Sequence, residues 1–201
     1  MSQWPTSPAP SSLKLGTVTP TRVSVTQNLK RNVRSVGAQR WKLDLGYTNM
    51  TRAQMAPILA FVMALRGQYG SFTFVMPTGS YETAQGSFAT PGTIQVDGAS
   101  QTGRSINLKG FTNSQTGVVK AGDFIKFSDS KVYMATADAN SDGSGHSTVS
   151  IEPSLIVSPA DSETVVYTSI PFTFALAGDA VEIPVRPPLI HDYSVSFVEA
   201  Y

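Results

Sequence analysis

The sequence Arg40-Trp41-Lys42-Leu43-Asp44-Leu45-Gly46-Tyr47 decides the fold class, because large apolar side chains alternate in it with polar or small ones. A period of two places the four large apolar residues on one face of a strand and the others on the opposite face. The pattern predicts a half-buried β-strand. Val23 and Val25 begin a similar strand upstream.

One helix is predicted directly after this strand. Thr51 and Gln54 have the spacing of a capping box, and Pro57 either lies in the first turn or restarts the helix. Gly67 can supply a left-handed end. Apolar residues recur at helical spacing at Ile58, Phe61, Val62 and Leu65. This face is typical of a helix that packs on a core.

The remainder of the chain favours short strands. Ser71–Met76 is one, and Phe172–Ala177 and Tyr193–Val198 are the last two. Between them lie shorter strand-like runs separated by Gly-containing turns: Thr93–Asp97, Ser105–Leu108, Asp123–Phe127, Lys131–Ala137, Thr148–Glu152 and Thr164–Tyr167. Many short strands without intervening helices indicate a small barrel or sandwich. We therefore expect a mainly-β protein with one α-helix.

A domain boundary is predicted near Pro77, where acidic residues and Gly-rich turns both become frequent. We expect an outer domain of residues 1–77 plus 171–201, with a small β-barrel of residues 78–170 inserted into it. By pattern alone, Phe172–Ala177 fits either domain.

The first twenty residues contain four prolines among Ser and Thr, which favours an extended arm without secondary structure of its own. Trp4 lies in this arm. Two interpretations stay open for it: an exposed anchor for a partner, or a side chain that packs on its own core.

Composition excludes several classes of site. The 201 residues include no cysteine and two histidines, so disulfides, thiolate metal sites, cysteine nucleophiles and multi-histidine zinc sites within one chain are excluded. The longest apolar run, Met55–Leu65, is shorter than the roughly 20 residues that span a bilayer. The N-terminus lacks the basic start and apolar core of a signal peptide. We expect no membrane association.

The formal net charge of +1 conceals a separation of charge along the chain. Residues 1–77 hold nine basic residues and one acidic residue, whereas residues 78–201 hold six basic and thirteen acidic residues. We interpret this separation as a means of matching partner surfaces.

No motif indicates catalysis. Asp138–Gly143 fits the first six positions of a calcium loop, but the twelfth position, a Glu in such loops, is Val149, and a hairpin loop is favoured. His146 lies in the same Gly- and Ser-rich hairpin, and His191-Asp192 is interpreted as a turn. We predict no catalytic, cofactor-binding or metal-binding residues and no enzyme activity, although a carboxylate pair brought together by folding is invisible in a sequence.

Sequence-specific nucleic-acid binding is not expected, because the predicted barrel is the acidic part of the chain. Its aromatic residues also lie mostly at strand-core spacing: Tyr81, Phe88, Phe111, Phe124, Phe127, Tyr133 and Tyr167.

Two blocks of sequence, taken in order, resemble distal tail proteins of long-tailed siphophages of Gram-negative hosts. The first is the strand Trp41–Tyr47 with the helix that ends Ala64-Leu65-Arg66-Gly67-Gln68-Tyr69-Gly70 and continues into Ser71–Pro77. The second contains Val119–Phe127, Lys131-Val132-Tyr133, an Asp/Gly hairpin and Thr148–Leu155. The resemblance covers most of residues 40–200.

The resemblance implies a tube-forming β-sandwich or β-barrel domain with an inserted OB-like barrel. It implies a hexameric ring at the tail tip, or baseplate, that joins the tail tube to the hub and fibre proteins and leaves a lumen for DNA. Such a protein is assembled in the host cytoplasm and becomes part of the virion. The family offers no catalytic residues to carry over.

Other functions stay open. A small β-barrel with aromatic and Asp-rich loops suits a carbohydrate-binding module of a tail tip, and a similar fold serves other tail components such as the tail-tube protein. An esterase or glycosidase within a tail is a further alternative, although no triad context supports it.

Overall fold

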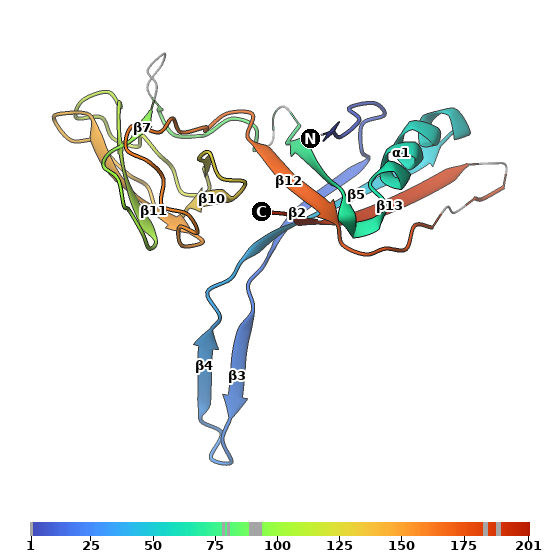
Figure 1. The fold of residues 1–201 in the computed structure, drawn as a ribbon, viewed down its shortest axis with the longest axis horizontal. Coiled ribbons are helices and arrows are strands. Elements are labelled where there is room, and N and C mark those ends of the chain that lie inside the picture. Colours follow the sequence, from blue (N-terminus) through green and yellow to red (C-terminus); the bar gives the residue numbers. More distant parts are fainter. Residues whose placement is uncertain (1, 78, 80, 89–93, 183–184, 188–189) are drawn as a thin grey trace. The chain divides into compact units, whose positions relative to one another are not determined.

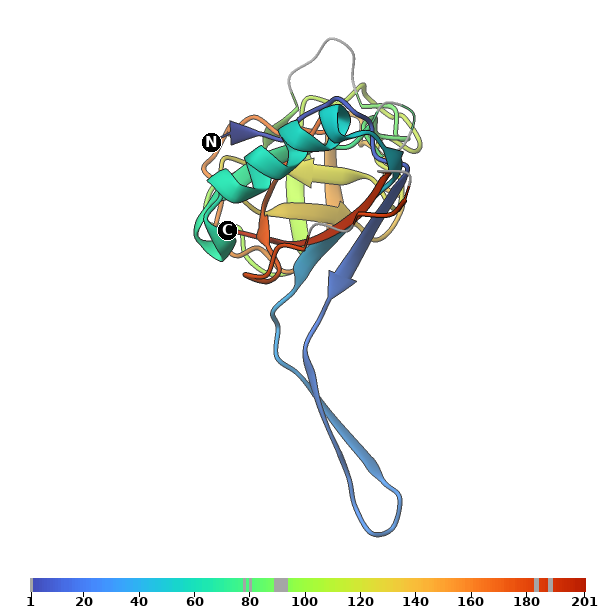
Figure 2. The same cartoon turned by 90° about the vertical axis from the view of Figure 1, so that its right-hand side faces the viewer.

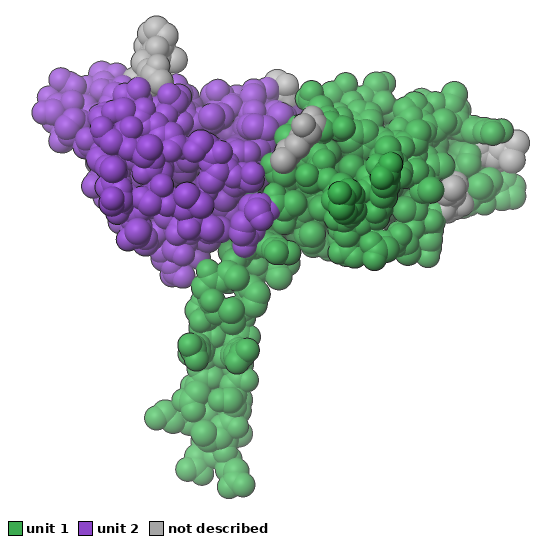
Figure 3. Space-filling model, in the orientation of Figure 1, with its two compact units in different colours: residues 1–74, 173–200 green, residues 75–172, 201 purple. Residues whose placement is uncertain are grey.

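The computed structural model describes residues 2–77, 79, 81–88, 94–182, 185–187 and 190–201. The chain divides into two compact units, coloured separately in Figure 3. Unit 1 comprises residues 1–74 and 173–200, and unit 2 comprises residues 75–172 with Tyr201. Within the described residues the secondary structure is mainly β with one α-helix (Figure 1), which confirms the predicted fold class.

Unit 1 is built on a six-stranded sheet. Its strands, in spatial order, are β1 (Ser2–Gln3), β6 (Ser71–Val75), β12 (Pro171–Leu176), β13 (His191–Glu199), β5 (Arg40–Met50) and β2 (Ser12–Val18). The long strand β5 pairs antiparallel with β13 on one side and with β2 on the other. Because β12 pairs with β13, the segment that fitted either predicted domain lies in this sheet.

One face of the sheet is covered by the helix α1 (Arg52–Ala64) (Figure 2). The predicted alternation in β5 is confirmed, since Leu43, Leu45 and Tyr47 are buried and the residues between them are partly exposed. From the helix, Ile58 and Val62 are fully buried. The buried side chains of β5, which recur every second residue, and those of α1, which recur at helical spacing, therefore pack against each other in one apolar layer.

The helix begins as predicted, but the left-handed backbone at its end starts one residue before Gly67, at Arg66, and the predicted place of Pro57 in the first turn or at a restart is wrong. The backbone N–H of Thr51 donates a hydrogen bond to Oε1 of Gln54 over 2.9 Å, as in a capping box. At the other end, Arg66 and Gly67 both have a left-handed backbone, with φ of 55° and 68°. Pro57 lies inside the helix, beyond the first turn.

The prediction of an N-terminal arm without secondary structure is wrong. β1 lies parallel to β6, and β2 pairs along its whole length with β5, so the first twenty residues supply both edge strands of the sheet. Trp4 is 4% exposed and its ring contacts Phe61, Phe72 and Phe197. The prolines lie mainly between the two strands, and aromatic burial holds the segment in place. Trp4 is therefore a core residue and not an exposed anchor.

The interpretation of His191-Asp192 as a turn is also wrong, because β13 begins there. His191 is buried and pairs with Met50 of β5. The pairing register with β5 shifts between His191 and Tyr193, but burial alternates along β13 from His191 onward. Asp192 accepts a hydrogen bond from the Asn49 backbone N–H and forms an ion pair with Arg186.

Unit 2 contains a five-stranded sheet. In spatial order its strands are β7 (Gln95–Val96), β8 (Ser105–Lys109), β11 (His146–Glu152), β10 (Val132–Ala135) and β9 (Phe124–Lys126). Each corresponds to a predicted run, although Thr93 of the first run lies outside the described residues. The buried apolar core includes Ile94, Ile106, Leu108, Ile125, Tyr133 and Val149.

The predicted strand Thr164–Tyr167 is present only as isolated bridges. Thr164 bridges Gln95 of β7, and Val166 bridges Lys126 of β9. Since β7 and β9 are the two edge strands of the sheet, this segment connects both edges and closes the sheet into a small barrel. Too few of its residues pair with either neighbour to form a regular strand.

Candidate functional site

The two histidines belong to different units and form no common site. His146 is the first residue of β11, and its Nδ1 lies 3.5 Å from Oδ2 of Asp97 on the exposed surface of unit 2. His191 is buried in unit 1. Among the described residues, no three His, Asp or Glu side chains are grouped so that they could hold a metal ion. No helix in the described part of the chain is long and apolar enough to cross a membrane.

In the loop Asp138–Gly143, the side-chain oxygens of Asp138 and Asn140 accept hydrogen bonds from other residues of the chain. Asp138 forms an ion pair with Lys120 at 2.7 Å and accepts a hydrogen bond from the Ala121 N–H. Asn140 Oδ1 accepts from the Gly117 N–H at 2.8 Å. The hydrogen bonds from Lys120 and from the Ala121 N–H lower the pKa of Asp138 below its usual range. The arrangement favours the hairpin-loop interpretation of this sequence.

The most distinctive surface of unit 1 is a β-hairpin formed by β3 (Thr21–Val25) and β4 (Arg31–Ser35). It continues the paired strands β2 and β5 and protrudes from the remainder of its unit in both views (Figures 1 and 2). All ten strand residues are exposed, so the predicted strand at Val23 and Val25 exists but is not half-buried. A two-stranded hairpin without a packed face is marginally stable in water.

One face of the hairpin is apolar. Val23 lies directly opposite Val33, and Val25 is on the same face two residues further along. Their side chains are 48%, 51% and 59% exposed, respectively. At the tip, Leu29 is 85% exposed. Exposed branched side chains on a protruding hairpin are typical of a surface that a partner covers.

The other face is cationic. Arg22 lies directly opposite Arg34, and like charges in this position destabilise a strand pair. Residues 19–39 also contain Lys30 and Arg31 but no acidic residue. Within the described residues, none of these four cations forms an ion pair. The hairpin therefore carries four uncompensated positive charges, and one of them, Arg31, pairs with Val25 and lies on the same face as the valines.

Sequence patterns did not reveal this hairpin as a unit. The turn contains no Gly: the Thr26 N–H donates to the Lys30 carbonyl at 3.0 Å, and Leu29 adopts the left-handed backbone with φ of 57°. Hairpin turns are usually recognised by Gly or Asn at such a position. The available signal was the alternation of Val with Arg, Ser and Asn on both sides of the turn.

The second surface of unit 1 is the sheet face opposite the helix. It presents mainly small or polar residues: Ser12, Lys14 and Gly16 of β2, Lys42, Asp44 and Gly46 of β5, and Ser194 and Ser196 of β13. The Lys42 Nζ lies 3.2 Å from Asp44, which also accepts a hydrogen bond from Ser196. Although partial burial acts in the opposite direction, these two partners lower the pKa of Asp44.

The charge separation follows the two units. Unit 1 contains ten basic and five acidic residues, and unit 2 contains five basic and nine acidic residues. Most acidic side chains of unit 2 have partners of their own, such as Asp161 with Lys109 at 3.3 Å and Glu152 with Arg104 at 3.4 Å. The hairpin therefore carries four of the ten basic residues of unit 1 and none of its acidic residues.

Comparison with known proteins concerns mainly the barrel. No curated protein matches the chain at a significant level. A match to a family model covers residues 83–170, most of unit 2. The family matched by these residues is described as distal tail protein pb9, B domain, and the match supports a structural component of a phage tail.

Proposed function

We propose that the protein forms the distal ring of a phage tail, with six copies closing around a lumen for DNA. In this proposal the ring lies at the tail tip, or baseplate, of the virion after assembly in the host cytoplasm. It joins the tail-tube protein on one side to the hub and fibre proteins on the other.

The observation that carries the proposal is the exposed hairpin β3–β4. Its valines and its four cations gain nothing from the described residues of their own chain, and a hairpin of this kind requires a partner surface to cover it. A second copy of the chain is the simplest such partner. If each hairpin contacts the next copy, the contact is heterologous, and a heterologous contact that closes by rotation makes a ring. The number six comes from the resemblance to distal tail proteins.

The uncovered face of the six-stranded sheet suits the lumen of such a ring. The residues named above for this face, among them Gly16, Gly46 and Ser194, are small or polar, so they offer few apolar groups to which a passing polymer could adhere. Helix α1 covers the opposite face, so only one face of the sheet is available for this role.

The test compares the full chain with a variant that lacks the hairpin. Val18 pairs directly with Arg40, so an Asn-Gly turn can replace residues 19–39 without a change of register in β2 and β5. Native mass spectrometry and electron microscopy should show six-fold rings for the full chain, alone or with its tube partner, and monomers for the variant. The unfolding midpoint of the variant should change little, since the deleted residues bury no apolar side chain and one polar one, Gln39, which donates a hydrogen bond to Thr17.

Two results would contradict the proposal: rings that form equally well without the hairpin, or a full-length chain that stays monomeric and is absent from virions. The same images separate the ring from a tail-tube protein. A distal ring should stop at one or two layers, whereas a tube protein should polymerise into long stacks.

A further inference from the structure

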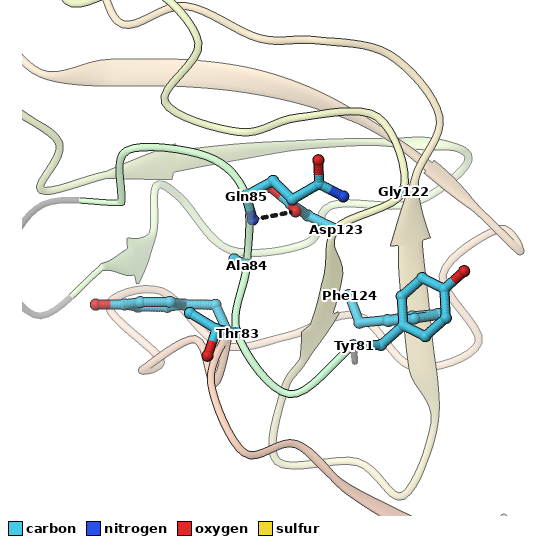
Figure 4. Close-up of a pocket in the computed structure, with 8 residues that line it drawn as sticks. Tyr81, Thr83, Ala84, Gln85, Gly122, Asp123 and Phe124 are labelled. Atoms are coloured by element: carbon cyan, nitrogen blue, oxygen red, sulfur yellow. Dashed lines mark hydrogen bonds between the residues drawn. The ribbon is translucent and has the colours of Figure 1, made fainter. Parts of the chain in front are cut away.

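Unit 2 contains a hollow of about 180 Å³ whose wall combines aromatic rings with polar side chains (Figure 4). It is lined by Tyr81, Thr83, Gln85, Asp123, Phe124 and Tyr167, together with Ala84 and Gly122. We propose that this hollow binds a single pyranose ring of a glycan. The proposal does not rest on ring assembly, because every lining residue belongs to unit 2.

The two tyrosine rings in the wall are each supported by a phenylalanine ring. Tyr81 is 53% exposed and contacts Phe124 edge to face, with ring centroids 5.5 Å apart. Tyr167 stacks on Phe88 at 4.2 Å, so one face of its ring is covered by protein. An exposed ring at Tyr81 and a partly exposed ring at Tyr167, both held in orientation, suit the apolar C–H face of a sugar, which packs flat on an aromatic surface.

The polar part of the wall offers both donors and acceptors. Within the described residues, the hydroxyls of Tyr81 and Thr83 and the side-chain amide of Gln85 have no hydrogen-bond partner. Each hydroxyl can donate and accept, and an amide has two donors and an acceptor. A ligand that satisfies them must carry several groups which also donate and accept, and the hydroxyls around a pyranose ring do so.

The hollow selects for a neutral ligand. Asp123 is its only ionisable acid, and its carboxylate accepts three backbone hydrogen bonds: from Gln85 at 2.6 Å, Gly86 at 2.9 Å and Lys120 at 2.8 Å. Because its oxygens already accept these hydrogen bonds and the residue is only 3% exposed, the carboxylate offers little to a ligand in the hollow. An acidic or strongly basic ligand would find no partner there.

The wall is also preformed. The hydrogen bonds to Asp123 fix the backbone at Gln85 and Gly86, and a Cβ at Gly86 would lie only 2.4 Å from the Val118 carbonyl oxygen. The segment therefore lies directly on the barrel backbone. A preformed site avoids the entropy cost of ordering a loop on binding.

The test uses a glycan array followed by saturation-transfer NMR with the methyl glycosides of glucose, galactose and N-acetylglucosamine. The full chain should bind at least one neutral glycan. Tyr81→Ala should weaken binding about tenfold, and Gln85→Ala should weaken it in the same direction. Tyr69→Ala is the matched control, because it removes an 88% exposed tyrosine from unit 1 and should leave binding unchanged.

Three outcomes would overturn the proposal: no glycan binding by the full chain, binding that is indifferent to Tyr81 and Gln85, or binding only of a proline-rich peptide offered on the same surface. Native mass spectrometry of the same samples reports ring assembly separately. Failure of the sugar site is thus distinguishable from failure of the proposed ring.

Discussion

The indole N–H of Trp4 donates a hydrogen bond to the hydroxyl of Tyr47 over 3.1 Å, although 43 residues separate them in the chain. Both side chains are buried, and the Trp4 ring contacts Phe61 of helix α1. It joins the N-terminal segment to the longest strand of unit 1. A segment whose composition is typical of a flexible arm is thereby part of the core.

Removal of the Trp4 ring should destabilise unit 1. We expect Trp4→Ala to lower its free energy of unfolding by about 3–5 kcal/mol, the usual cost of deleting a buried aromatic side chain. Urea unfolding followed by the fluorescence of Trp41, the other tryptophan of the chain, measures this unit specifically. Tyr69→Ala, which removes an exposed ring, should have little effect. An equal loss in both variants would contradict the core role of Trp4.

Alkaline pH should destabilise the same unit. Burial raises the pKa of Tyr47 and of Tyr193 above 10.0, so the folded state retains their protons at a pH where the unfolded chain loses them. Their contribution to stability is complete below pH 10 and is lost as the pH rises through the folded-state pKa values. Urea unfolding between pH 8 and pH 11.5 should show this decline. Tyr47→Phe should make it shallower, and an unchanged slope would show that burial of Tyr47 is not the cause.

Charge on the hairpin should govern assembly. Arg34→Glu places a carboxylate opposite Arg22, which stabilises the strand pair locally by about 0.2–1 kcal/mol. The same change removes two units of positive charge from the proposed contact surface, so we expect fewer rings in sedimentation experiments. Arg52→Glu makes an identical change of charge outside the hairpin and serves as the control. Equal loss of rings in both variants would indicate net charge, not the hairpin, as the determinant.

The buried carboxylate of Asp123 should be essential for the barrel. Asp123→Ala leaves three backbone N–H groups without their acceptor, and we expect a loss of about 2–3 kcal/mol in the stability of unit 2. Hydrogen exchange read by mass spectrometry over residues 81–127 should show faster exchange at low denaturant. Asp142→Asn, a change at an exposed carboxylate of the same unit whose side chain accepts hydrogen bonds from Ser144 and His146, outside residues 81–127, should leave that exchange rate unaltered.

Calcium should not bind the loop Asp138–Gly143. The oxygens of Asp138 and Asn140 already accept hydrogen bonds from the protein, and Val149 stands where a calcium loop supplies a bidentate Glu. Isothermal titration with CaCl₂ should give no saturable heat, and the melting temperature should be equal in calcium and in EDTA. Saturable binding that Asp138→Asn abolishes would overturn this expectation.

Several elements could be predicted because their signals are local. The alternation in Arg40–Tyr47 and the helical spacing from Ile58 to Leu65 both lead to the observed structure, since each period is a property of the backbone itself. The capping pair Thr51 and Gln54 is equally local. The barrel strands were recognisable by the turns that separate them.

Other elements depend on pairing between distant residues. β1 exists because it lies beside β6, seventy residues away, and Thr164–Tyr167 is placed by bridges to both edges of a sheet. His191 is in a strand because it pairs with Met50 of β5, although the pairing register shifts between His191 and Tyr193. In each case the local sequence is compatible with more than one structure.

From the sequence by itself follow the mainly-β class, the single amphipathic helix, the lack of cysteine chemistry and the separation of charge along the chain. The tertiary structure decided which of these residues face solvent. Trp4 is buried and the valines of the hairpin are exposed, against the usual expectation for a proline-rich arm and an alternating strand. Burial depends on what packs against a side chain, and that packing comes from residues far away in the sequence.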